Sequence, residues 1–236
     1  MKKVFAVIVL MIVVHYVHSQ DVKTENQDST DKSAVTSGKP SESVFPGVWR
    51  PLFDGETLNG WKIVRYGGEG EPHVANGALV LPKPVSGLMT GVCWDGDPLP
   101  VNNYAIYYEA RRTEGLDIFA GLTFPYKDKY ASLILGGWSG IVNGLSSING
   151  SDASENETKQ LFSLNNNQWY QIELRVTADS ICATLDTKQI LNLATAGKQI
   201  HLRPGSIGEG LTLWSYLSTG EIRNLRIKKL PSYLKK

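Results

Sequence analysis

WYQIELRVTADSICATLD, residues 169–186, is the stretch that decides the fold. Apolar and polar residues alternate strictly over 171–177 and again over 181–186, with Ala178-Asp179 near the junction of the two runs. A period of two residues is that of a half-buried β-strand, and a short polar interruption between two such runs is typical of a hairpin. The stretch therefore predicts a pair of antiparallel strands.

The same period recurs through the rest of the chain. It covers 104–112, where Glu109 and Arg111 fall on the polar face, and continues in 118–124 and 131–135. Segments 151–158 and 191–196 are the best helical candidates, and each is at most a turn or two long. The last strand changes phase at Arg223-Asn224, which predicts a β-bulge. Many short strands without crossover helices predict an all-β fold of two packed antiparallel sheets, a sandwich or jelly roll.

The composition excludes several classes of protein. Lys and Arg number 24 against 23 Asp and Glu, so the net charge of +1 leaves no basic surplus for a nucleic-acid partner. Four His and two Cys are too few for a Cys/His zinc module or a disulfide-stapled mini-domain. His73 and His201 are not in a metal-binding spacing, and no G-x-S-x-G elbow occurs. Any chemistry is left to carboxylates, hydroxyls and aromatic rings.

The sequence predicts a signal peptide and a flexible linker over the first 43 residues. Residues 1–19 have Lys2 and Lys3, an apolar run and a terminal VHS, which is the pattern of a secretory signal peptide. The alternative is an uncleaved anchor, but the run 4–14 is shorter than the roughly 20 residues that cross a bilayer. Residues 20–43 are polar and predict a disordered linker. We expect one domain over 44–236, secreted or periplasmic, with no membrane contact after signal cleavage.

Four segments in order carry a family resemblance: PLFDGETLNGW (51–61), NGALVLP (76–82), NYAIYYEARR (103–112) and TGEIRNLRIKKL (219–230). They resemble the LFDGxxLxGW opening, the NGxL strand, the Glu-x-Arg strand and the closing FRNIxIxxL strand of the 3-keto-disaccharide hydrolase family, formerly a domain of unknown function. The resemblance implies a concanavalin A-like jelly roll and carbohydrate degradation outside the cytoplasm. One departure is that 129–133 read KYASL, where many relatives have an acidic residue, as in GYEVQ.

The resemblance also implies a chemistry. A ketone at the third ring carbon acidifies the neighbouring C–H bond, so a base can start an elimination that releases the glycosidic oxygen before water adds. We expect Glu109 or Glu155 to be the base, Arg111 to steady developing negative charge, and Asp117 or Asp152 to assist. The alternatives are a structural salt bridge for Glu109 and Arg111 and simple turn chemistry for Asp117.

The run 136–158, rich in Gly, Ser and Asn, replaces the usual segment and is expected to form part of any site. Because it contains Asp152, Glu155 and Glu157, this run could bind a sugar or a divalent cation, and a divalent cation is the one cofactor that we consider. The alternative is that the run is a solvated surface loop. Tryptophans that stack on sugar rings are expected at 138 and 214, whereas Trp61 and Trp169 are assigned to packing. The residues expected to bind substrate are Trp138, Ser139, Asp152, Asn156 and Trp214.

Two questions stay open at this point. Cys93 and Cys182 could form one disulfide or remain two thiols. The function is expected to be that of an exported glycoside hydrolase acting on an oxidised disaccharide or glycoside. The alternatives are a non-catalytic carbohydrate-binding module, which the missing acidic residue favours, and an adhesion domain without a sugar site.

Overall fold

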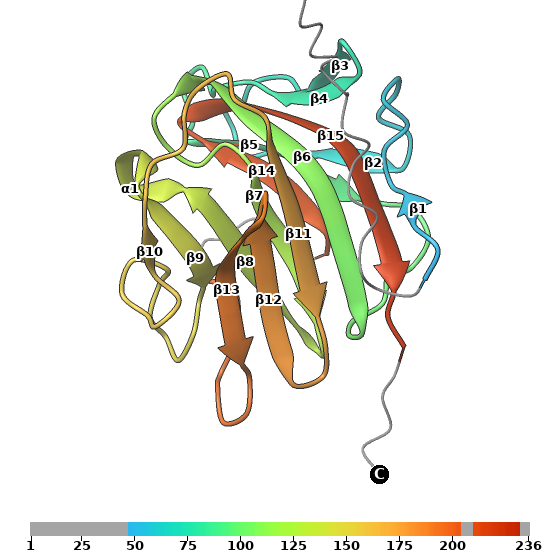
Figure 1. Ribbon diagram of the computed structural model, residues 1–236. Helices are drawn as coiled ribbons and strands as arrows, with labels where there is room; N and C mark the ends of the chain where they lie inside the picture. The colour runs from blue at the N-terminus through green and yellow to red at the C-terminus, as the bar shows by residue number, and fades with distance from the viewer. Residues whose placement is uncertain (1–46, 204–209, 232–236) are drawn as a thin grey trace, which may run out of the picture. The chain divides into compact units, whose positions relative to one another are not determined.

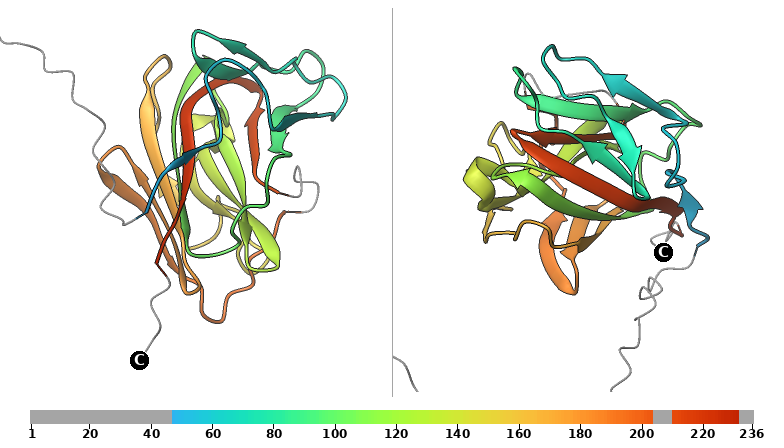
Figure 2. Two further views of the ribbon diagram at one scale, coloured as in Figure 1. Left: turned by 90° about the vertical axis from the view of Figure 1, so that its right-hand side faces the viewer. Right: turned by 90° about the horizontal axis from the view of Figure 1, so that it is seen from above.

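Two antiparallel β-sheets face each other in the computed structural model, which describes residues 47–203 and 210–231 (Figure 1; Figure 2). The signal peptide and linker expected for residues 1–43 lie outside the described residues. Sheet A has the strand order β13 (Lys188–Ala194), β12 (Ser180–Leu185), β11 (Tyr170–Val176), β6 (Tyr104–Gly115), β15 (Ser218–Lys229), β4 (Ala78–Leu81) and β3 (His73–Ala75), and β1 (Arg50–Pro51) also pairs with β15. Sheet B has the order β10 (Gln160–Leu161), β9 (Val142–Ser146), β8 (Lys129–Gly136), β7 (Gly121–Tyr126), β14 (Thr212–Tyr216), β5 (Met89–Trp94) and β2 (Trp61–Val64).

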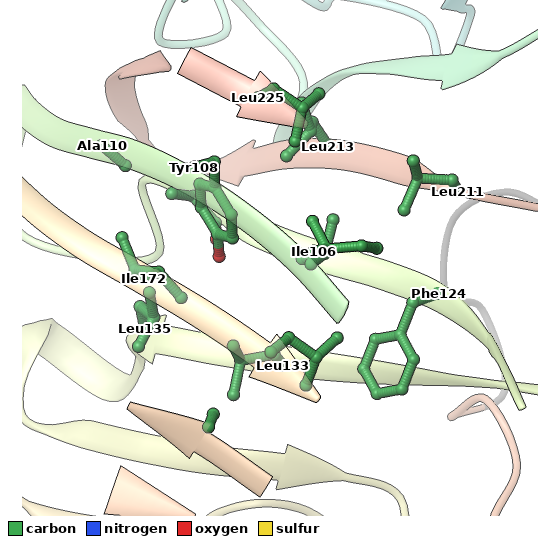
Figure 3. Close-up of a cluster of buried hydrophobic side chains, with 14 of the residues drawn as sticks. Ile106, Tyr108, Ala110, Phe124, Leu133, Leu135, Ile172, Leu211, Leu213 and Leu225 are labelled. Atoms are coloured by element: carbon green, nitrogen blue, oxygen red, sulfur yellow. The ribbon is translucent and has the colours of Figure 1, made fainter. Parts of the chain in front are cut away.

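The main core fills the space between the two sheets, and strand alternation builds it. Sheet A contributes Ile106 and Tyr108 from β6 and Ile172 from β11, all fully buried. Sheet B meets them with Phe124 from β7 and Leu133 from β8 (Figure 3). Every second residue of these strands therefore points outward, and each sheet has an outer face on which chemistry can be placed.

Several predictions about local structure are confirmed. The stretch 169–186 forms β11 and β12, with Val176 paired to Ile181 beside the turn. The register of β15 against β6 shifts between Arg223 and Arg226, so the predicted bulge is present, and Asn224 takes a left-handed φ of 54° there.

The expected helical turn at 191–196 is wrong. Residues 188–194 form β13, because the apolar side chains of 190, 191 and 193 pack into the core against β12.

In the part of the chain that the structure describes, helical structure is confined to one short turn, α1 (Gly137–Gly140), at the end of β8. Within residues 47–203 and 210–231, no helix has the length and apolar character needed to cross a bilayer. Cys93 lies in sheet B and Cys182 in sheet A, and no disulfide joins them. Strands, loops and the short turn α1 thus position the side chains of the site.

Candidate functional site

The outer face of sheet B is hollowed into a pocket of about 480 Å³. It crosses the strands from β9 to β5, which at the usual strand spacing is about 19 Å. We call it the sheet B pocket; it is lined by Leu88, Met89, Asp117, Ile118, Ser132, Ile134, Trp138, Ser146, Asp152, Arg203, Trp214 and Tyr216. Its volume is that of a site for one small molecule.

One end of the pocket, over β8 and β9, is polar. Ser132 and Ser146 are paired across these strands, and Asp152 follows in the next loop. One carboxylate oxygen of Asp152 accepts hydrogen bonds from the Ser146 hydroxyl and from the Ala153 N–H (2.9 Å). The other lies 2.7 Å from Nη1 of Arg203, whose side chain is 62% exposed. A fixed carboxylate thus contacts a guanidinium that is largely exposed to solvent.

A strained turn carries an indole to the rim of the pocket. Gly136, Trp138 and Ser139 all have left-handed φ angles, of 69°, 48° and 61°. This conformation is uncommon for residues with a Cβ and persists only where neighbours hold it. Asp117 does so: its Oδ2 accepts the Ser139 N–H at 3.0 Å, while its Oδ1 accepts the Ile118 N–H at 2.9 Å. As a result the Trp138 side chain lines the pocket and stays 38% exposed.

Arg112 lies behind this rim and is only 4% exposed. It donates hydrogen bonds to the carbonyls of Asp117 (3.2 Å) and Leu164 (2.6 Å) and to Oδ1 of Asn166 (2.5 Å). Burial lowers the pKa of the Arg112 guanidinium, which nevertheless stays charged because its ordinary pKa is so high. One buried cation thereby ties together the segments that carry Asp117 and the end of the loop after β10.

The other end of the pocket, over β14 and β5, is apolar. The Trp214 indole lies flat against Gly121, where a Cβ would come within 2.5 Å of the ring, and its Nε1 donates to Thr123 Oγ1 at 3.2 Å. Trp214 belongs to a small apolar cluster, separate from the main core, against which Met89 and Tyr216 also pack. The pocket is therefore polar at one end and apolar at the other.

The structure brings together four of the predicted site residues: Asp117, Trp138, Asp152 and Trp214 all line the pocket. Ser139 contributes its backbone N–H to Asp117, and its side chain is not part of the lining. The buried amide of Asn156 donates to the carbonyls of Leu145 and Ser151, so it holds the loop. Glu155 is exposed on that loop, outside the lining.

Glu109 and Arg111, expected to be the base and the residue that steadies negative charge, share one surface as predicted but lie outside the sheet B pocket. Both point outward from β6 on sheet A, the opposite layer. Glu109 accepts hydrogen bonds from Arg223 (2.8 Å) and Asn224 (2.8 Å), and Arg111 pairs with Glu221 at 2.6 Å. Burial would raise the pKa of Glu109, but these donors outweigh it and hold the pKa below its usual value. The alternative reading, a cross-strand ion pair, describes this face.

Trp169, which we assigned to packing, lies on this outer face and packs there. Its ring is sandwiched between two guanidinium groups, with Arg223 4.0 Å and Arg111 4.7 Å from the ring centroid. It is partly buried by these cations and not by the hydrophobic core. Trp61, in contrast, is 8% exposed and belongs to the main core, as predicted.

Sequence reasoning missed the residues that complete the polar end: Ser132, Ser146 and Arg203. Strand alternation in β8 could have placed Ser132 on the outer face, opposite Leu133. Arg203 has no such signal, because it reaches the pocket from a loop that only the tertiary fold positions. Among the residues that the structure describes, no three His, Cys, Asp or Glu side chains are grouped so as to hold a metal ion.

Comparison with known proteins identifies the family. The model of the 3-keto-alpha-glucoside-1,2-lyase-like domain, the 3-keto-disaccharide hydrolase family, matches residues 48–228, so the chain belongs to this family, as its motifs predicted. No curated protein matches the chain.

Solved structures share the fold. A protein described as a glycosyl hydrolase from Parabacteroides distasonis ATCC 8503 superposes with a TM-score of 0.51 at 13% identity, over 78% of this chain and 94% of that one. SCLam, a non-specific endo-beta-1,3(4)-glucanase from family GH16, gives 0.53 at 13% identity over 80% and 94%. The Crh5 transglycosylase in complex with NAG gives 0.54 at 8% identity over 79% and 84%. At these identities the likeness confirms the concanavalin A-like jelly roll and nothing finer.

Proposed function

We propose that this protein is an exported glycoside hydrolase that cleaves a 3-keto-glycoside in the sheet B pocket by proton abstraction and elimination, followed by addition of water. The family supports a carbohydrate-related function. The observation that carries the proposal is the contact between the Asp152 carboxylate and the Arg203 guanidinium at the polar end of the pocket. Export rests on the signal-like N-terminal segment.

The reaction needs a base and a cation side by side. The acidic hydrogen of a 3-keto-glycoside is on carbon 2, one bond from the ketone carbon, and its removal places negative charge on the ketone oxygen. Positioned donors stabilise such charge, and a positioned carboxylate takes the proton. Asp152 and Arg203 offer these two groups side by side, in contact at 2.7 Å.

The steps balance with these residues alone. Asp152 takes the proton from carbon 2, and Arg203 turns to the enolate oxygen. The enolate then expels the glycosidic oxygen. The bond from carbon 1 to that oxygen breaks, a double bond forms between carbons 1 and 2, and the leaving oxygen takes from Asp152 the proton that Asp152 removed from carbon 2. Water finally adds across that double bond and restores the 3-keto sugar. Asp117 accepts sugar hydroxyls at the rim, and the exposed Trp138 ring stacks on the sugar.

A second candidate, a non-catalytic carbohydrate-binding module, is favoured by one specific observation. Ser132 lies on the floor of the pocket in the strand segment where many relatives carry an acidic residue. Both aspartates are also already engaged, Asp152 by Arg203 and Asp117 by two backbone N–H groups. Such a pocket would bind a saccharide without breaking it.

The test offers the purified protein a 3-keto-disaccharide and its unoxidised parent and measures sugar release. Release from the keto compound only, with a drop of about 100-fold or more in Asp152→Asn, supports the enzyme. Glu155→Gln, three residues away on the same loop and outside the lining, is the matched control and keeps wild-type activity. Binding without release from either sugar selects the module, and neither binding nor release refutes both candidates.

A further inference from the structure

The polarity of the sheet B pocket changes across the sheet. Hydroxyl and charged groups gather over β9 and β8, whereas Leu88 and Met89 at the start of β5 and Tyr216 at the end of β14 form the far end. Met89 and Tyr216 are paired across these two strands, so they form one continuous wall. A bound molecule that fills the pocket meets a polar wall at one end and an apolar wall at the other.

Exposed apolar side chains also gather at this end of the pocket. Leu88 is 56% exposed and Leu217 38%, and the backbones of these two residues are hydrogen-bonded to each other at 3.0 Å. This exposed pair adds apolar surface that an apolar part of a ligand can cover.

A second sugar ring would be a poor occupant of the apolar end. Its hydroxyls would lose water against the Leu88 and Met89 side chains, neither of which can accept or donate a strong hydrogen bond, and Tyr216 offers a single hydroxyl there. Polar groups that are desolvated without a partner weaken binding. A ring that carries no hydroxyls would instead gain from the same surface.

We propose that the preferred ligands are glycosides whose aglycone is an apolar ring, with the sugar over β8 and β9 and the aglycone over β14 and β5. The inference rests on the proposed function in one respect, that the pocket takes a glycoside. Leu88 and Met89 are then the residues that determine specificity for the leaving group. This specifies the leaving group, which the family description leaves open.

The test measures binding, so that it does not depend on catalysis. Cyclohexyl glucoside and a glucosyl-glucose disaccharide, both unoxidised, are titrated into the full-length protein by calorimetry. We expect the cyclohexyl compound to bind at least about tenfold more tightly. Equal affinity, or tighter binding of the disaccharide, overturns the proposal.

Variants assign the preference to the apolar wall. The double variant Leu88→Asn/Met89→Gln replaces two apolar side chains by polar ones of similar branching and length and is expected to remove the preference for the cyclohexyl compound. Leu161→Asn, on the edge strand β10 and 65% exposed, is the control that keeps it. A double variant that retains the preference and a normal melting curve contradicts the assignment.

Catalysis then separates the two proposals. With the 3-keto forms of both compounds, the ratio of their kcat/KM values should fall in the double variant relative to wild type, which cancels the intrinsic reactivity of the two leaving groups. If neither compound is cleaved but the cyclohexyl compound binds more tightly, the proposed reaction fails and the aglycone preference stands. If both are cleaved with an unchanged ratio, the reaction stands and the aglycone preference fails.

Discussion

The outer faces of sheets A and B carry similar charged and aromatic side chains. They differ in how far these side chains remain accessible to a ligand. On sheet A, Glu109, Arg111, Glu221 and Arg223 are paired across β6 and β15, and Trp169 is covered by two guanidinium groups. On sheet B, Trp138 is exposed and Asp152 and Arg203 meet at the edge of a pocket. Charged and aromatic residues on a strand therefore do not make a site; the loops that rise around a face decide whether it is hollow.

The largest effect should follow from removing the buried cation behind the pocket rim. Arg112→Met leaves one buried and two partly buried acceptors without their donor, and a buried acceptor alone costs about 1–3 kcal/mol, so we expect a loss of about 3 kcal/mol in the free energy of unfolding. Chemical denaturation measures this loss. Arg111→Met, the neighbouring residue on the exposed face, is the control and should cost less; equal losses would contradict the difference between the two positions.

Filling the space under the Trp214 indole should have the next largest effect. Gly121→Ala places a Cβ within 2.5 Å of the ring, so the ring must move, and we expect a cost of about 1–3 kcal/mol together with weaker saccharide binding. Thermal denaturation and ligand titration check the two parts. Unchanged ligand affinity in a destabilised variant would show that the Trp214 ring does not shape the pocket.

Breaking the network on sheet A should alter stability and leave ligand binding intact. Glu109→Gln loses charge-assisted hydrogen bonds from Arg223 and Asn224, so we expect a loss of about 1–2 kcal/mol at pH 7. Because the folded state lowers the pKa of Glu109, its contribution is full above the ordinary glutamate pKa of about 4.3 and is lost as the pH falls through the lower, folded value. The two unfolding free energies should therefore converge in acid. A gap that widens below pH 4 would reverse the sign and contradict the assignment.

The smallest effects are expected from replacing Trp138 and Trp169, one on each outer face. Trp138→Ala should weaken saccharide binding by about 1 kcal/mol, since an exposed ring face is lost, with little change in stability. Trp169→Ala should leave the affinity unchanged and lower the stability, because it removes the stacking with Arg111 and Arg223. Calorimetric titration of both variants decides; the reverse pattern would place the ligand on sheet A.

The fold could be predicted from the sequence because alternation is a local property. The hairpin of β11 and β12, the inward set of β6 and the bulge at Arg223 follow from residues close together in the chain. Alternation also placed Glu109 and Arg111 together on an outward face, correctly, but it contains no information about which of the two outer faces is hollow.

The site could be predicted only where a residue lies in or next to an unusual segment. Trp138 and Asp152 were found through the Gly- and Ser-rich run 136–158, and Asp117 through its place before β7. Arg203 and Leu88 were missed because each reaches the pocket from a segment remote in sequence, and tertiary contacts alone bring them there. Trp169 packs, as assigned, but its partners could not be predicted because they are two cations and not apolar neighbours.

A crystal structure of the protein soaked with an unoxidised glucoside tests the central claim most directly. We predict ligand density on the outer face of sheet B, with the sugar within hydrogen-bonding distance of Asp152 or Arg203 and against the Trp138 ring. Density on sheet A, over Trp169 and Arg223, would contradict the account.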